Sequence, residues 1–234
     1  LSQFSANSHK EVYKALIDLK EKSMQELIFD LRGNGGGYLD AAINIADEFL
    51  PDGDLIVYTK GRAKGRQDYF ASSKGIFEKG KIIVLIDEIS ASASEIVAGA
   101  LQDNDRATII GRRSFGKGLV QEQKQLLDGS VVRLTVSRYY TPSGRCIQRP
   151  YTNGDSEKYY MDFIERYAQM ENNSDTISHA DSLKYKTKKG RIVYGGGGIE
   201  PDKELSYNLY KRSESYSLLI RKGLIYKYCF DYLD

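Results

Sequence analysis

The spacing of apolar residues changes along this chain, and each change predicts a new element. Apolar positions three or four apart over Lys10–Lys22 predict a helix with one buried face. The same spacing returns over residues 40–50, where Asp40 can cap the helix. Unbroken apolar runs at Leu27–Leu31 and Lys81–Asp87 predict short buried strands.

The central elements alternate between strands and helices. A helix over 92–103 directly follows the strand at Lys81–Asp87, and residues 107–111 predict the next strand. Such alternation predicts parallel strands, because the helix returns the chain to the same end of the sheet. Residues 54–59 predict another strand, and 60–80 a polar excursion. We therefore expect an α/β fold with a mostly parallel sheet covered by helices.

The carboxyl-terminal part of the chain is more polar. Val131–Thr141 predicts a long strand, and the motif that follows it contains a Pro-Ser-Gly turn. Residues 151–182 predict a polar insertion with one amphipathic helix, whose apolar face carries Tyr160, Phe163, Ile164 and Tyr167.

The last elements complete a proposed domain organisation. Residues 183–194 predict a hairpin that turns at Lys189 and Gly190. We expect a core of residues 1–202, which includes the insertion, and a helical tail over 203–234.

Composition is that of an ordinary soluble globular protein, with 234 residues, 41% hydrophobic and 28% charged. The net charge of +2 indicates no polyanionic partner, and the basic run Lys184–Arg191 predicts a solvated hairpin. The aliphatic run Ile82–Ile86 is far too short to span a membrane. The chain starts at Leu1 without a methionine or a leader, so we expect a processed product or a piece of a longer protein.

Histidine and cysteine are too sparse for several common catalytic sites. His9 and His179 lie in polar contexts away from any candidate nucleophile, which argues against a Ser–His–Asp triad. Cys146 and Cys229 form no metal-ligand spacing, and they leave open one disulfide or two free thiols. Hydrolysis here would need a carboxylate or a lysine as its base.

A serine-rich segment stands where a buried strand meets a helix. Ser90, Ser92 and Ser94 precede Glu95 at that junction, which exposes a side chain at the carboxyl edge of a sheet. The free N–H groups of the helix start suit a developing oxyanion. The alternative is that these serines only cap the helix.

A lysine between two glycines is the candidate base. Lys117 lies in Phe115-Gly116-Lys117-Gly118, where the glycines allow an inward turn. A lysine can serve as a base where burial keeps its amine neutral. If 119–126 is a strand, Gln121 faces the same side as Lys117 and can hold its amine. An ordinary surface turn is the alternative, and no complete phosphate-binding motif is present.

The glycine-rich loop after the first strand offers more free N–H groups. It runs from Asp30 to Gly37 with the sequence DLRGNGGG. Such a loop can approach a reacting carbonyl closely, because glycine has no side chain. A plain strand-to-helix turn is the alternative.

Taken together, five segments resemble one family. DLRGNGGG, SASASEIVAGALQD, GRRSFGKGLVQ, RYYTPSGRCIQ and GGGGIEPD resemble the C-terminal processing (tail-specific) proteases over about residues 1–202. These are Ser/Lys-dyad enzymes of the crotonase-like (ClpP/crotonase) fold. The resemblance implies that Ser92 is the nucleophile, Lys117 its general base and Gln121 the residue that orients the lysine. It also implies an oxyanion hole made by the backbone N–H groups of Ala93 and of Gly36 or Gly37.

The resemblance also carries expectations about the biological setting. The implied substrate is an extended polypeptide, cut near the C-terminus of a protein. The family places a PDZ domain upstream and works outside the cytoplasm, in the bacterial periplasm or anchored to a membrane. It needs no cofactor or metal, and it leaves the oligomeric state open.

Two other functions compete with a peptidase. A non-catalytic peptide-binding module could keep this fold, although the sequence retains the serine, lysine and glutamine together. A crotonase-like acyl-CoA enzyme would need an adenosine-phosphate site and a catalytic carboxylate, and no motif for either is evident.

Overall fold

The computed structural model describes residues 1–151, 157, 159, 161, 183–205, 218–219 and 222–231. The helices described are α1 (Ser8–Glu21), α2 (Leu39–Asp47), α3 (Ala93–Asp103) and α6 (Leu224–Asp231). The strands are β1 (Glu26–Asp30), β2 (Leu55–Lys60), β3 (Gln67–Phe70), β4 (Lys81–Ile86), β5 (Thr108–Gly111), β6 (Leu119–Gln125), β7 (Val131–Tyr140), β8 (Lys184–Lys186), β9 (Ile192–Tyr194) and β10 (Lys203–Glu204).

The first sheet is parallel throughout, as the alternation of strands and helices predicts. Its order is β1-β4-β5-β10, with Phe29 opposite Val84 and Val84 opposite Ile109. These three side chains are buried on the face that carries the core. The edge strand β10 lies in the expected tail, so the sheet extends past the boundary expected at residue 202.

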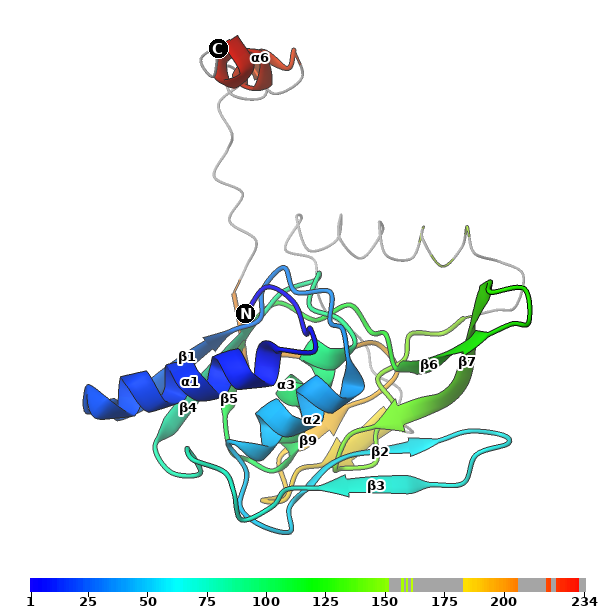
Figure 1. Cartoon of the computed structure of the whole chain (residues 1–234). Helices are drawn as coiled ribbons and strands as arrows, with labels where there is room; N and C mark the ends of the chain where they lie inside the picture. The colour runs from blue at the N-terminus through cyan, green and yellow to red at the C-terminus, as the bar shows by residue number, and fades with distance from the viewer. Residues whose placement is uncertain are drawn as a thin grey trace.

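A second sheet is antiparallel, which limits the expectation of a mostly parallel fold. Its order is β3-β2-β7-β6, and each of its pairings is antiparallel. Strand β3 lies inside the expected polar excursion over 60–80. Its Gln67, Asp68 and Phe70 are exposed, so no apolar pattern marked it as a strand. In Figure 1 β6 and β7 extend from the body as a long hairpin.

The three helices of the core pack beside the sheets (Figure 1). Helix α2 packs between α1 and α3, and α3 also contacts β2 and β5. Every residue of α3 is buried, so this helix lies at the centre of the molecule. The N-cap of α2 is Tyr38, and Asp40 lies in the first turn. The expected cap was therefore wrong by two residues, although a carboxylate in the first turn still favours a helix.

Two of the carboxyl-terminal elements correspond to expected ones, a hairpin and a helix. Strands β8 and β9 form the expected hairpin, whose turn is closed by the Gly190 N–H donating to the Thr187 carbonyl. Helix α6 lies in the expected helical tail and stands apart from the sheets in Figure 1. The amphipathic helix expected within 151–182 falls outside the described residues.

Candidate active site

Three loops meet at the carboxyl edge of the first sheet. They follow β1, β4 and β5, and parallel strands bring such loops to one edge. The Ala91 N–H donates to the Asn34 carbonyl at 3.1 Å, and the Phe115 N–H donates to the Ser90 carbonyl at 3.0 Å. The fold thus brings together the glycine loop, the serine segment and the lysine turn.

Ser92 differs from its two neighbouring serines. Ser90 and Ser94 are fully buried, and their hydroxyls donate to the carbonyls of Leu31 (2.8 Å) and Asn34 (2.9 Å). Ser92 is only partly buried and is the N-cap of α3, with φ 55° and ψ −113°. A positive φ costs a non-glycine residue about 1–3 kcal/mol, and such strain is concentrated at functional sites. The two outer serines anchor the glycine loop, whereas Ser92 starts the helix and remains partly exposed.

Glu95 joins the serine segment to the lysine turn, a role that the sequence analysis missed. Its buried carboxylate accepts the N–H groups of Ser92 (2.8 Å), Gly116 (2.7 Å) and Lys117 (2.9 Å). It also accepts the Ser114 hydroxyl at 2.6 Å. The S-x-x-E spacing from Ser92 to Glu95 is a known helix-start signal and could have indicated the first contact.

The charge state of Glu95 follows from opposing effects. Burial raises the pKa of the Glu95 carboxyl, and the hydrogen bonds that it accepts act in the opposite direction, leaving the pKa above its usual value. Three of its four partners are backbone N–H groups, which can only donate. The arrangement therefore fits the ionised carboxylate.

The lysine turn is packed into the protein. Gly116 has φ +89°, and a Cβ there would lie 2.5 Å from Cγ of Arg149. The Gly118 N–H donates to the Gln148 side chain at 2.8 Å. These contacts argue against an ordinary surface turn. Lys117 is partly buried, and within residues 1–151 no hydrogen bond joins its amine to the Ser92 hydroxyl. Catalytic hydrogen bonds are often long in unliganded sites.

The glycine loop approaches the start of α3 from the other side. A Cβ on Gly36 would lie 2.7 Å from Cβ of Ser92 and 2.9 Å from N of Ala93, so only glycine fits there. The Gly36 N–H already donates to the Asn34 side chain at 2.9 Å. In the described part of the chain, the N–H groups of Ala93 and Gly37 donate no hydrogen bond.

Asp87, at the end of β4, fixes the approach of this loop. Its carboxylate accepts the N–H groups of Gly33 and Ser90, each at 3.0 Å. From its sequence context, Asp87 is only the last residue of a predicted strand. The two loops that flank the helix start are therefore held by one carboxylate.

Gln121 lies on β6 with an exposed side chain. Lys117 precedes that strand, and the register of β6 against β7 shifts between Val120 and Gln121. A bulge of this kind interrupts the alternation of faces. The spacing argument that placed Gln121 beside Lys117 therefore does not hold, and its orienting role stays a prediction.

The other candidate residues lie elsewhere. His9 contacts the Glu48 carboxylate at 2.7 Å, and His179 falls outside the described residues. Cys146 is a free thiol, whose pKa is raised by burial. Among the residues described, no group of His, Cys, Asp and Glu side chains is placed to bind a metal. Over the same residues, no helix has the length and apolar character that a membrane span needs.

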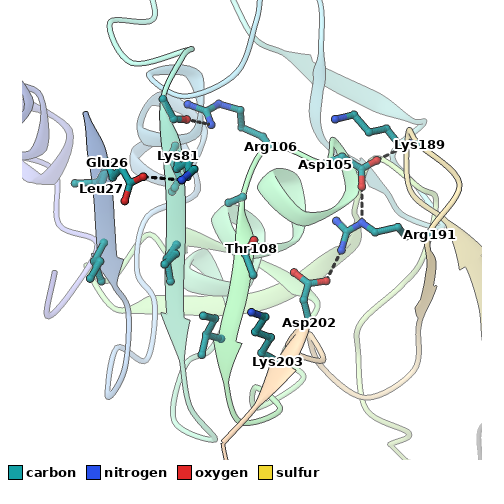
Figure 2. A pocket seen from close by; sticks show the side chains of 16 residues that line it. Glu26, Leu27, Lys81, Asp105, Arg106, Thr108, Lys189, Arg191, Asp202 and Lys203 are labelled. Carbon is teal, nitrogen blue, oxygen red and sulfur yellow. Dashed lines mark hydrogen bonds and ion pairs between the residues drawn. The ribbon is translucent and has the colours of Figure 1, made fainter. Parts of the chain in front are cut away.

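A groove of about 930 Å³ lies along the first sheet, away from this site (Figure 2). It is lined by Ile28, Ile83 and Ile110 and bordered by the linked charges of Asp105, Arg191 and Asp202. None of its lining residues belongs to the serine segment, the lysine turn or the glycine loop. It is therefore separate from the candidate active site.

Comparison with known proteins agrees with the resemblance seen in the sequence. The carboxyl-terminal-processing protease of Synechocystis sp. is 47% identical over 149 residues, which are 64% of this chain and 34% of the relative. The chloroplastic carboxyl-terminal-processing peptidase 1 of Arabidopsis thaliana is 41% identical over 143 residues, 61% of this chain and 29% of the relative.

Solved structures give the same relationship. The photosystem II D1 C-terminal processing protease matches with a TM-score of 0.58 and 38% identity, over 63% of this chain and 38% of that protein. The chain thus spans about a third of the length of these relatives. The model of peptidase family S41 matches residues 1–157. This chain belongs to peptidase family S41.

Proposed function

We propose that this chain is the catalytic part of a serine endopeptidase that acts through Ser92 and Lys117. The observation that carries the proposal is the Glu95 carboxylate, which accepts the backbone N–H groups of both residues. A strained, partly exposed serine at the start of a buried helix is the geometry expected of a nucleophile.

In the proposed reaction, the Ser92 hydroxyl attacks a peptide carbonyl while the Lys117 amine takes its proton. The N–H groups of Ala93 and Gly37 stabilise the oxyanion, because neither donates to another described residue, whereas the Gly36 N–H donates to Asn34. Lys117 then protonates the leaving amine, and water hydrolyses the acyl-enzyme.

The finer features of the family are part of the same proposal. The core would be crotonase-like, with Gln121 as the residue that orients Lys117. The substrate would be an extended polypeptide cut near its C-terminus, as the names of the relatives imply. A PDZ domain upstream in the full-length protein and a site of action outside the cytoplasm complete the proposal. Family membership argues against the acyl-CoA enzyme.

A fluorophosphonate probe and a fluorogenic peptide test the function directly. Ser92→Ala should abolish labelling and lower turnover by about 10³-fold or more, because the nucleophile is lost. Ser90→Ala should keep measurable labelling, since the buried Ser90 hydroxyl bonds only to the Leu31 carbonyl and to Asp87 within the described residues and is not exposed to a substrate.

The outcome separates the peptidase from a peptide-binding module. Unchanged turnover in Ser92→Ala would remove this serine from the mechanism. A parent chain that binds peptides but neither cleaves them nor labels would instead identify the binding module.

A further inference from the structure

A tyrosine of the second sheet contacts both candidate catalytic residues. Tyr139 lies near the end of β7 with only 1% of its surface exposed. Its hydroxyl oxygen is 2.6 Å from the Lys117 carbonyl oxygen and 3.1 Å from the Ser92 carbonyl oxygen. Ser92 and Lys117 are 25 positions apart, so this one hydroxyl bridges two separate segments.

Tyr139 and Glu95 hold the same two residues by opposite backbone groups. Glu95 accepts the N–H groups of Ser92 and Lys117. The single Tyr139 O–H donates mainly to the Lys117 carbonyl at 2.6 Å and shares its proton with the more distant Ser92 carbonyl. The Ser92 carbonyl also accepts the N–H groups of Glu95 and Ile96 at the helix start. The Lys117 carbonyl has no other hydrogen-bond partner within residues 1–151, so Tyr139 matters most to the lysine.

The position of the hydroxyl is fixed by its strand. The Tyr139 N–H donates to the Gly118 carbonyl at 3.0 Å, so β7 is bonded to the lysine turn by backbone and side chain together. Burial and the neighbouring Glu95 carboxylate raise the pKa of Tyr139 well above its usual value. The phenol therefore keeps its proton and remains a donor over the whole working range of an enzyme.

We propose that Tyr139 is a positioning residue of the peptidase, which sets the distance between Ser92 and Lys117 by binding both backbone carbonyls. The proposal rests on the function proposed above. It predicts that loss of one hydroxyl slows the chemistry without weakening peptide binding, because Tyr139 is buried and does not reach the substrate.

The test compares Tyr139→Phe with Tyr140→Phe. Both variants remove a phenolic oxygen from β7. The Tyr140 ring stacks on Tyr58 with centroids 4.8 Å apart, and phenylalanine preserves that contact. In Tyr139→Phe, kcat and the rate of fluorophosphonate labelling should fall about tenfold or more, with KM within about twofold of the parent. Tyr140→Phe should match the parent in all three quantities.

Restoring a hydrogen-bond donor at position 139 tells whether Tyr139→Phe loses activity through misplacement of Ser92 and Lys117 or through a general loss of stability. Incorporating para-aminophenylalanine at position 139 restores a donor on the same ring and should recover most of the labelling rate. All measurements are made where thermal unfolding shows each variant to be folded. If Tyr139→Phe does not fold, the amino variant carries the test, and a labelling rate at the parent's level supports the proposal. Parent-like kcat and labelling in a folded Tyr139→Phe, or no rescue by the amino variant, would overturn it.

Amide hydrogen exchange gives a readout that needs no catalysis. In Tyr139→Phe the peptides covering 90–95 and 114–118 should exchange faster than in the parent and in Tyr140→Phe. If the parent protein neither cleaves peptide nor labels, the proposed function is rejected. The hydrogen-exchange rates would then test by themselves whether the Tyr139 hydroxyl links the Ser92 and Lys117 segments. Unchanged exchange in both peptides would reject the bridge.

Discussion

At the scale of single residues, one buried carboxylate determines the geometry of the site. Ser92 is held in a strained conformation, and such strain persists only where the surroundings over-determine it. Glu95 meets that need, because it accepts one hydrogen bond from the helix start and three from the loop after β5. Ser92 and Lys117 are therefore held by the same carboxylate before any substrate arrives.

Replacing Glu95 with glutamine should damage both folding and catalysis. The amide keeps the volume but removes the charge, and its NH₂ group would face N–H donors. We expect a loss of about 2–4 kcal/mol in the free energy of unfolding. Turnover should also fall in the molecules that remain folded. Urea unfolding and peptide cleavage measure the two effects.

The matched control for this substitution is Glu122→Gln. Glu122 is exposed on β6 and pairs with Lys64 at the surface, so the change should cost less than about 1 kcal/mol. Equal destabilisation by both substitutions would contradict the central role of Glu95.

At the scale of elements, the glycine loop lies so close to the start of α3 that it fixes the surroundings of Ser92. Gly36→Ala should nearly abolish activity, because its Cβ would lie 2.5 Å from the Ala91 carbonyl oxygen and φ is +95°. Gly35→Ala is the control, since nothing lies within 4 Å of a Cβ there and its φ is not positive. Labelling of Ser92 and peptide turnover should separate the two variants. Similar activity in both would show that the loop can move away from Ser92.

The elements themselves were largely predictable, whereas their contacts were not. Helical spacing identified α1 and α3, and apolar runs identified β1 and β4. The prediction that the first of these strands is buried was wrong in part, because Ile28 on β1 is 65% exposed and only Phe29 is buried. The apolar pattern missed β3, whose side chains are mostly exposed, and it misplaced the cap of α2. The meeting of Ser92 with Lys117 depends on tertiary structure, so sequence reached it only through the family resemblance. Glu95 was missed because a carboxylate in the first helical turn is ordinary by itself.

At the scale of the whole molecule, charged contacts tie the β8–β9 hairpin and Asp202 to the core. The hairpin of β8 and β9 reaches Asp105, just beyond α3, through the Arg191 guanidinium (2.6 Å) and the Thr187 hydroxyl (3.1 Å). Arg191 also pairs with Asp202, whose carboxylate accepts the Ile109 N–H of β5 at 2.7 Å (Figure 2). Segments distant in sequence thus join at the end of α3.

Asp105 gives this link a pH dependence whose sign can be worked out. Burial by itself raises the pKa of the Asp105 carboxyl. The hydrogen bonds from Arg191, the Lys189 N–H and Thr187 lower this pKa by more, so the net result lies below the usual value. A lowered pKa in the folded state means that the unfolded chain binds more protons. The carboxylate therefore stabilises the fold above pH ~4, the usual aspartate pKa, and this contribution is lost as the pH falls through the lowered value.

Asp105→Asn isolates that contribution. Asparagine tolerates the positive φ of 55° at this position, so the backbone is preserved. At pH 7 the variant should unfold with a free energy lower by about 1–2 kcal/mol, because it loses the charge-assisted hydrogen bonds. The difference in the free energy of unfolding between parent and variant should decrease as the pH falls below ~4, because the aspartate then becomes neutral as well. Asp52→Asn, at an exposed turn before β2, is the control and should leave the free energy of unfolding at pH 7 unchanged. Urea unfolding from pH 7 to 3 makes the comparison, and a difference that stays constant over this range would show that the Asp105 charge does not hold the hairpin.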